Sequence, residues 1–220
     1  MLTFVEAIKQ ANIFELEDNL RAGINPNLLL KGFYPLQLAV SFLLEYPDHT
    51  TQNQLIIIEK LLTAGAVPNI PSEGISLIHQ LICGNHYFNS RWLSLFNSNE
   101  KELDENSRWQ AIELLIKHGA DIDVLTADEA DSPIIKALFR REAIIAIGLL
   151  RHGAEVDITL NNTRLPIWHL ACDIGSLALL ECLIDRQINI NEIDANRDSA
   201  FEYLSKKSEL NKARRLHVNR

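Results

Sequence analysis

The stretch that decides the fold is Leu115–Asp123, LIKHGADID, which returns as LLRHGAEVD at Leu149–Asp157. After the same interval, Leu183–Asn191 (LIDRQININ) repeats it again, with glutamine in place of the glycine. Looser copies lie upstream at Leu61–Asn69 and Leu20–Asn27. Self-similarity at a period of about 34 residues is typical of repeat proteins, in which each repeat is one structural unit that packs against its neighbours.

A second recurring element lies between these segments and predicts the starts of helices. Ser132 is expected to accept a hydrogen bond from a first-turn amide, and Pro133 suits the first helical position because its φ is already helical. The glycine of each L-L-x-x-G-A step, such as Gly119 or Gly153, is expected to end the second helix in the left-handed conformation. When Ala171 is aligned with Ala137, Pro166 falls one residue earlier than Pro133, which predicts an extra residue at that helix start.

A 33- or 34-residue unit with a T-P-L-H-x-A start and an L-L-x-x-G-A-D-x-N exit resembles the ankyrin repeat. The resemblance covers nearly the whole chain and implies an all-α ankyrin repeat solenoid of about six helix-turn-helix units with short β-hairpin connections. The expected units of this single domain are about 1–27 as an N-terminal cap, 28–69, 70–123, 124–157, 158–191 and 192–220 as a C-terminal cap. The C-terminal cap is expected to hold helices near 199–206 and 209–217.

The resemblance also assigns roles to single residues. The family uses its motif histidine to bond loop backbone, and His79 and His169 occupy that position here. In the other units the position is held by Gln37, Ile135 and Glu202. Asn69 and Asn191, each eight residues after a leucine, resemble sites that an asparaginyl hydroxylase modifies in ankyrin proteins.

Two adjacent units depart from the regular spacing. The step from Ala137 to Gly153 shows the regular interval, but the same interval is longer by about ten residues in the second unit and by about 22 in the third. The inserts, near 44–53 and 83–108, fall in the intra-unit turns and should form one composite surface. Their aromatic residues are Tyr46, Tyr87, Phe88, Trp92 and Phe96. These rings either cover the widened turns, as aromatic stripes usually do, or anchor a partner protein.

The connections between units form a second candidate binding surface. Acidic residues dominate these tips, which either keep the edge solvated or select a basic segment of a partner through complementary charge. Interspersed arginines would fix the partner's orientation. The candidate partner-binding residues outside the inserts are Asp128, Glu129, Asp131, Arg140, Arg141, Asn162, Arg164, Asp194 and Arg197.

Charge and composition exclude several classes of function. The formal net charge is -8, but residues 206–220 carry +5, so the remaining body carries -13. An acidic body repels phosphates, so a nucleic-acid or lipid-surface role would depend on that short tail. The apolar run at 36–44 is too short for a membrane span. The three cysteines form no C-x-x-C pair and the start lacks a signal peptide, which together favour a cytoplasmic protein. Alone, the chain is expected to be monomeric.

One rival hypothesis involves chemistry. His79, Cys83 and His86 have ligand-like spacing, so a zinc site or a small enzyme could be built around them. Against this, His79 already matches the motif position, and no phosphate loop, dinucleotide fingerprint or H-E-x-x-H sequence occurs. We therefore expect neither catalysis nor a cofactor.

The sequence predicts a protein–protein interaction module that binds a partner through its concave groove, hairpin tips and insert surface. The composition and ankyrin-only architecture also resemble effectors that intracellular bacteria deliver into host cells. Binding of a host protein by such an effector is therefore kept as an alternative.

Overall fold

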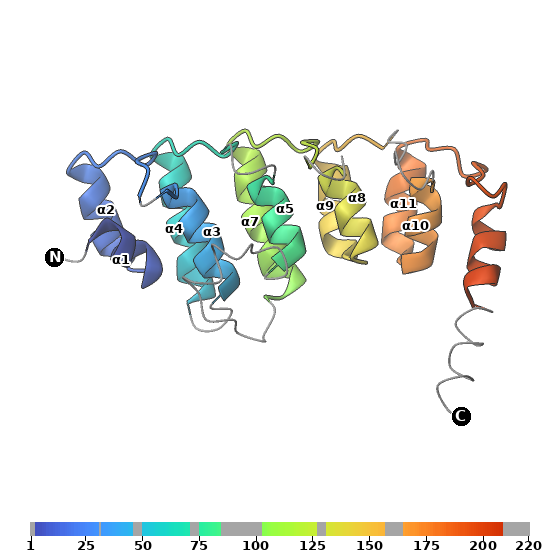
Figure 1. The fold of residues 1–220 in the computed structure, drawn as a ribbon, viewed down its shortest axis with the longest axis horizontal. Helices are drawn as coiled ribbons and strands as arrows, with labels where there is room; N and C mark the ends of the chain where they lie inside the picture. The colour runs from blue at the N-terminus through green and yellow to red at the C-terminus, as the bar shows by residue number, and fades with distance from the viewer. Residues whose placement is uncertain are drawn as a thin grey trace, which may run out of the picture. The chain divides into compact units, whose positions relative to one another are not determined.

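All the regular elements that the structure describes are α-helices (Figure 1). The structure is a computed structural model, and it describes residues 3–30, 32–45, 50–70, 75–84, 103–126, 131–156 and 165–208. The helices are α1 (Phe4–Lys9), α2 (Ile13–Arg21), α3 (Pro35–Glu45), α4 (Thr51–Thr63), α5 (Leu77–Cys83), α7 (Glu105–Lys117), α8 (Pro133–Phe139), α9 (Ala143–Arg151), α10 (Ile167–Ile174) and α11 (Leu177–Asp185). Residues 200–208 are also helical. The all-α prediction is therefore correct over the described residues.

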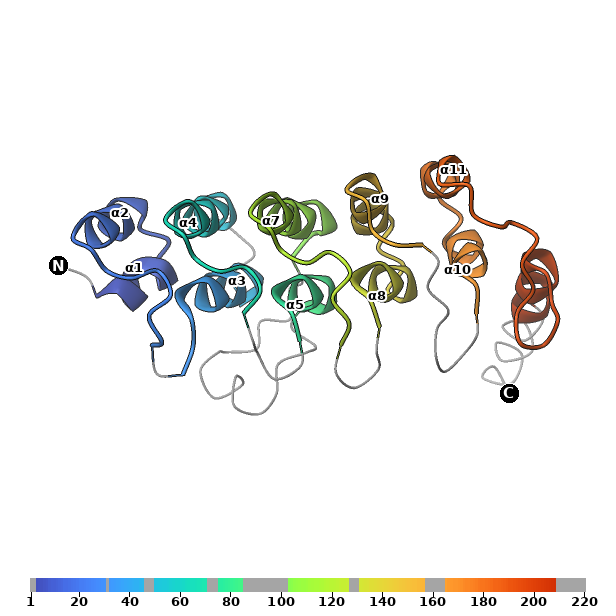
Figure 2. The same ribbon diagram turned by 90° about the horizontal axis from the view of Figure 1, so that it is seen from above.

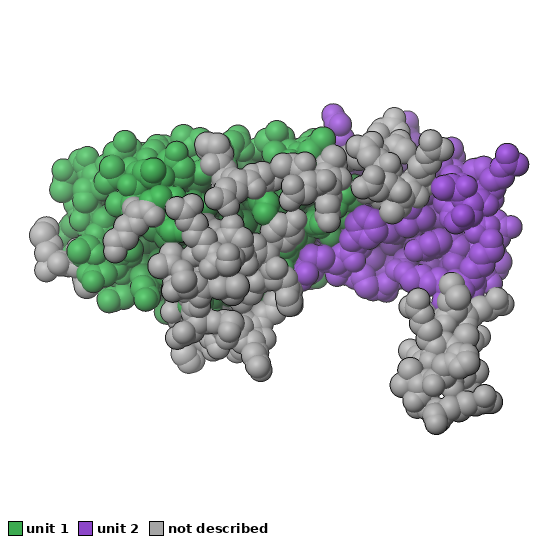
Figure 3. All heavy atoms as spheres, viewed as in Figure 1, with its two compact units in different colours: residues 1–136 green, residues 137–220 purple. Residues whose placement is uncertain are grey.

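The chain separates into two compact units, Met1–Lys136 and Ala137–Arg220, which are coloured in Figure 3. The boundary falls inside α8. The division into six repeat units within one domain stays a prediction.

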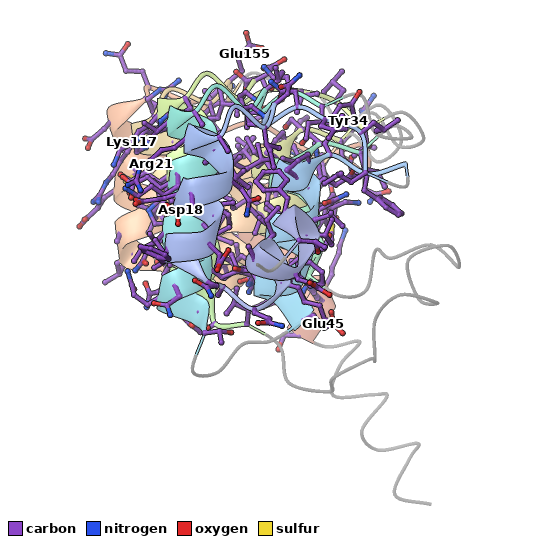
Figure 4. The ribbon with its side chains drawn as sticks, turned by 90° about the vertical axis from the view of Figure 1, so that its left-hand side faces the viewer. Asp18, Arg21, Tyr34, Glu45, Lys117 and Glu155 are labelled. Atoms are coloured by element: carbon purple, nitrogen blue, oxygen red, sulfur yellow. The ribbon has the colours of Figure 1, made fainter. Side chains whose placement is uncertain are left out.

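The first compact unit has two layers of helices. Figure 2 shows α1, α3 and α5 in one row and α2, α4 and α7 in a second row. Consecutive helices pair across the rows, α1 with α2, α3 with α4 and α5 with α7. Figure 4 shows Asp18, Arg21 and Lys117 on the side of the second row and Tyr34 on the opposite side. The labelled charged side chains of the second row thus face water, while most of its apolar residues, such as Leu16, Ile58 and Ile112, are buried.

The second compact unit continues with α9, α10 and α11. The helix α11 packs against both α10 and α9, and the helical segment 200–208 follows α10 in the other row (Figure 2). Pro166 is the N-cap of α10, whereas Pro133 is the first residue of α8. Both helices start four residues before the equivalent alanines, Ala137 and Ala171, so the predicted extra residue at this helix start is not found and only the place of the proline differs.

The ends of the helices follow the predicted chemistry with one exception. Gly119 and Gly153 have φ values of 90° and 97°, and Gln187 takes the same left-handed region at 58°. A residue in the left-handed conformation ends a helix by turning the chain so that the following amides bond the last helix carbonyls, and glycine adopts it at the lowest steric cost. The hydroxyl of Ser132, however, is buried without a hydrogen-bond partner, so the predicted cap bond is wrong.

The smaller insert lengthens both helices of its unit. The helices α3 and α4 have 11 and 13 residues, whereas α8 and α9 have 7 and 9. All eleven residues of α3 are buried, including the polar Gln37, Ser41 and Glu45. The predicted insert near 44–53 therefore overlaps the last two residues of α3 and the first three of α4.

The larger insert adds a turn to its second helix. The helix α7 has 13 residues and starts after Asp104, whose carboxylate accepts a hydrogen bond of 3.0 Å from the backbone amide of Ser107. The first helix, α5, has the regular length of 7 residues. Residues 85–102 of this insert lie outside the described residues.

The predicted β-hairpin connections are wrong over the described residues, which contain no strand. Leu30 and Phe33 form an isolated antiparallel bridge, with reciprocal backbone hydrogen bonds of 2.8 and 3.0 Å. Two other tips are closed in a similar way: the amide of Thr126 donates to the carbonyl of Asp131, and the amide of Asp194 donates to that of Asp198. One pair of bonds closes a tip but is too short to extend a ladder along two strands.

None of the helices in the described ranges is long and apolar enough to cross a membrane. This finding agrees with the absence of a long apolar run in the sequence.

Candidate functional site

The best-defined polar site of the first compact unit surrounds His79 on α5. The ring is fully buried, and its Nε2 lies 3.0 Å from the carbonyl oxygen of Asp131. Its Nδ1 lies 2.9 Å from the hydroxyl of Ser76, the N-cap residue of the same helix. A carbonyl oxygen can only accept, so Nε2 carries the proton and Nδ1 accepts from Ser76. The motif-histidine role predicted for His79 is confirmed.

This environment keeps His79 neutral. Burial lowers the pKa of His79 from 6.5 to about 4, and the charge of nearby Lys136 acts in the same direction. The bond to Asp131 acts in the opposite direction and is weaker than burial, though stronger than the effect of Lys136. Because the single ring proton is used to hold a loop, His79 acts here as a structural hydrogen-bond donor.

The same two bonds bear on the zinc hypothesis. Both ring nitrogens of His79 already have partners, so a metal ion would have to displace one of them. Cys83 lies buried in the last turn of α5, and His86 lies outside the described residues. No group of three metal-ligating side chains converges within the residues that the structure describes.

His169 has the corresponding role in the second compact unit. Its Nε2 lies 3.0 Å from the carbonyl oxygen of Asp198, and its ring meets the edge of Tyr203 at a centroid distance of 5.7 Å. Each motif histidine therefore donates a hydrogen bond to the backbone carbonyl of an aspartate. In both cases this aspartate is followed by a serine and then by a first-row helix. The family-based expectation for both histidines is confirmed by this shared geometry.

Asp131 and Asp194, two of the candidate partner-binding residues, are buried in the loops that they close. The amide of Asp131 donates to the hydroxyl of Thr126 at 3.1 Å, and its carboxylate lies 3.3 Å from Nζ of Lys136. The carboxylate of Asp194 accepts from the amides of Asn196 and Asp198. Burial alone would raise the pKa of Asp194, but these bonds hold it below the ordinary value. Both carboxylates thus stabilise loops instead of facing solvent.

The arginines among the candidates have different positions. Arg140 lies 3.6 Å from Glu142, and Arg141 forms an ion pair with Asp173 and also donates to its carbonyl at 2.8 Å. Arg197 is exposed at the tip that Asp194 closes and has a left-handed φ of 65°. The remaining candidates lie outside the described residues: Tyr46, Tyr87, Phe88, Trp92, Phe96, Asp128, Glu129, Asn162 and Arg164.

Asparagine side chains join the loops that follow the second helices. In the first compact unit we call residues 23–30, 65–70 and 119–126 the exit loops. Asn69 donates to the carbonyl of Gly119 at 2.9 Å and accepts from the amide of Asp121 at 2.8 Å. Asn27 makes the same two bonds to Gly65 and Val67. Each asparagine therefore fixes the next exit loop, and both polar atoms of the Asn69 amide are occupied.

Two arginines that bond backbone carbonyls, the buried Arg108 and the exposed Arg186, were missed by the sequence reasoning. Arg108, in the first turns of α7, is buried and donates to the carbonyls of Ile82 and Leu103, each at 3.0 Å. Arg186, after α11, donates to the carbonyls of Leu150 and Ala154 at 2.8 and 2.9 Å. Both guanidinium groups satisfy carbonyls near helix ends, where cations are favoured. A lone arginine carries no motif, so only the fold reveals its target.

These features define, over the described residues, an all-helical protein of paired helices whose loops are held by histidine and asparagine side chains. A stretch of 101 residues, 46% of the chain, is 34% identical to the human protein "Ankyrin repeat and MYND domain-containing protein 1". The match spans 8% of the length of that protein. No family model matches the chain. The similarity supports ankyrin-like repeats in part of the chain.

Proposed function

We propose that this chain is a protein-interaction module that binds a partner protein without catalysing a reaction. The observation that carries the proposal is a set of exposed apolar side chains on the exit loops of the first compact unit, Leu28, Leu29, Val67 and Leu125. Large apolar side chains on loops fixed by hydrogen bonds can bury surface in a complex at little entropic cost.

Charge supports a particular kind of partner. The exit loops also present the exposed carboxylate of Asp121, and the chain as a whole has a formal net charge of -8. A partner segment that combines basic and apolar residues would match both features. The similarity to an ankyrin-repeat protein supports a protein partner in the same way.

The insert surface belongs to the same proposal as a second contact region, with Trp92 and Phe96 as its anchors. A cytoplasmic location, a monomeric state and the bacterial-effector alternative are further parts of the proposal. They imply that the partner is an intracellular protein, of the host in the effector case.

The proposal is tested by affinity capture with the intact chain and identification of the bound proteins. The double variant Val67→Asp and Leu125→Asp should lose the captured partner, because it places charge on both exit loops. The matched control is Phe14→Asp, since Phe14 is also an exposed apolar residue but lies on α2. Retention of the partner by the double variant, or equal loss with Phe14→Asp, would overturn the role of the exit loops.

A second variant tests the insert region. A chain that lacks residues 86–105 should bind the same partner more weakly if Trp92 and Phe96 contact it. Unchanged binding by the deletion variant would show that the insert only covers the core.

A further inference from the structure

The loop that joins α11 to the helical segment 200–208 presents two apolar side chains and an arginine to solvent (Figure 1). Ile190 is 47% exposed and Ile193 is 54% exposed. Arg197 is also exposed and follows Ile193 by four residues. We call residues 190–198 the terminal loop. An arginine beside exposed apolar side chains has the composition of an energetic centre of a protein interface.

Bonds within the terminal loop and to the neighbouring helices hold it in place. The carboxylate of Asp194 accepts from the amides of Asn196 and Asp198, and the amide of Asp194 donates to the carbonyl of Asp198. The same carbonyl bonds His169 of α10, and the carboxylate of Asp198 forms an ion pair of 2.6 Å with Lys206. A loop that is ordered before binding loses little conformational entropy in a complex.

The backbone of Arg197 has a conformation that glycine adopts more readily. Its φ is 65°, and Gly32, which also lies five residues before the motif-histidine position, has a φ of 91°. A residue with a Cβ enters this region at a steric cost that glycine avoids. Because strained residues cluster at functional sites, the arginine side chain is expected to have a role that glycine could not supply.

That role does not lie inside the protein. Within the part of the chain that the structure describes, the guanidinium of Arg197 forms no ion pair and no hydrogen bond. Arg141 has a similar φ of 63°, but its guanidinium bonds both the carboxylate and the carbonyl of Asp173. The cost at Arg141 is therefore offset by contacts within the second compact unit, whereas the side chain of Arg197 is available to a partner.

Charge indicates the kind of partner. Both aspartates of the terminal loop are buried and bonded, so the charges that it presents to solvent are Arg197 and, five residues earlier, Glu192. A guanidinium offers two parallel N–H groups that match the two oxygens of a carboxylate. We propose that the terminal loop binds a protein segment in which a carboxylate lies beside apolar side chains. Arg197 bonds the carboxylate, and Ile190 and Ile193 contact the apolar groups.

This surface rests on the proposed interaction function and extends it to the second compact unit. The exit loops of the first compact unit suit a segment that combines basic and apolar residues, whereas the terminal loop suits an acidic one. Two surfaces of opposite preference would fix the direction in which a partner of mixed charge binds.

Short synthetic peptides test the proposal with the full-length chain. The peptides share apolar residues around a central position that holds glutamate, glutamine, lysine or phosphoserine. The intact chain should bind the glutamate peptides about 10-fold more tightly than the glutamine peptides, because the charged hydrogen bonds are lost with glutamine. Equal binding of these two sets, or a preference for lysine or phosphoserine, would overturn the proposal.

The variant Arg197→Gly separates binding from folding. It should abolish the preference for glutamate, whereas the control Arg151→Gln, which removes an exposed arginine of α9, should keep it. Glycine relieves the steric cost at this φ but adds entropy to the unfolded chain, so the thermal midpoint should change little. A clear fall of the midpoint together with the lost preference would show that Arg197 holds the loop and binds nothing.

Two further variants place the contact. Ile193→Ser should weaken the binding of all four sets of peptides, and unchanged binding would count against the terminal loop. The double variant Val67→Asp and Leu125→Asp should bind the glutamate peptides as tightly as the intact chain, since it alters only the exit loops. Loss of the preference in this variant would instead assign the peptides to the exit loops.

The same variants distinguish this proposal from the wider function and from a lipid surface. The exit loops are tested by capture of a partner and the terminal loop by the peptides, so either result can fail while the other stands. Vesicles that contain phosphatidylserine should not bind the chain through Arg197. Vesicle binding that Arg197→Gly abolishes, without selection among the peptides, would replace the protein segment by an anionic membrane.

Discussion

Acid should destabilise the first compact unit through His79. The folded protein holds this ring neutral, with a pKa of about 4, whereas the unfolded chain has the ordinary value of 6.5. Between these values the unfolded state binds a proton that the folded state does not. The free energy of unfolding therefore rises with pH in this window, and the contribution of His79 is fully present above 6.5 and lost as the pH falls toward 4.

The size of the effect follows from the two pKa values. Their difference corresponds to a total loss of about 3 kcal/mol. About 1.4 kcal/mol of this should be lost near pH 5.5 and about 2.5 kcal/mol near pH 4.5. A loss of this size is a large part of the stability of an ordinary domain.

The assay is equilibrium unfolding in urea, followed by circular dichroism at a series of pH values between about 4 and 8. The comparison is with His79→Gln, which keeps an amide donor near the Asp131 carbonyl but cannot titrate. Carboxylates contribute equally to both proteins, so the difference between the two curves isolates His79. If the free energies of unfolding of both proteins show the same pH dependence between pH 4 and 6.5, the conclusion that His79 is held neutral in the folded protein is refuted.

Three further predictions concern the bonds that hold the loops and helices. Asn69→Ala should lower the free energy of unfolding by about 1–2 kcal/mol because both exit-loop bonds are lost. The control Asn53→Ala, at an exposed site, should change it by less than about 0.5 kcal/mol. Equal losses for the two variants in urea unfolding would contradict the assignment. Arg108→Met should cost about 2–3 kcal/mol because the buried carbonyls near the end of α5 lose a charged donor, and an unchanged thermal midpoint would count against it. Asp173→Asn weakens the ion pairs with Arg141 and Lys207 and should speed hydrogen exchange in residues 200–208 by about 3–10-fold. Exchange rates equal to those of the unmodified chain would show that apolar contacts alone hold this helix.

Much of the local structure could be predicted because it depends on short-range chemistry. Pro133 begins α8, Pro166 directly precedes α10, and Gly119 and Gly153 end helices with positive φ. These features follow from the conformational limits of single residues, which hold wherever the residue lies. The positions of His79 and His169 were also correct, because the repeat places them at the same point in their helices.

The errors of the sequence interpretation concern residues whose surroundings come from distant parts of the chain. Asp131 and Asp194 look like exposed acidic tips in a loop, but the structure buries both. The sequence analysis predicted β-hairpins where the described loops are closed by only one or two backbone hydrogen bonds. The sequence pattern shows where a loop turns, but not how many backbone bonds close it. Arg108 looked like the end of a polar insert, but its guanidinium meets carbonyls near the end of α5.

The sequence by itself determined that this chain repeats a two-helix unit, because a period of about 34 residues and its turn residues are readable from single positions. Only the tertiary structure decided which polar side chains serve the fold. A carboxylate or guanidinium is chemically the same in both environments, and its role depends on the backbone groups within about 3 Å of it. Leu177 and Ile184 of α11 show the same dependence: they are 76% and 53% exposed, whereas Leu55 and Leu62, at the equivalent positions of α4, are 5% and 4% exposed.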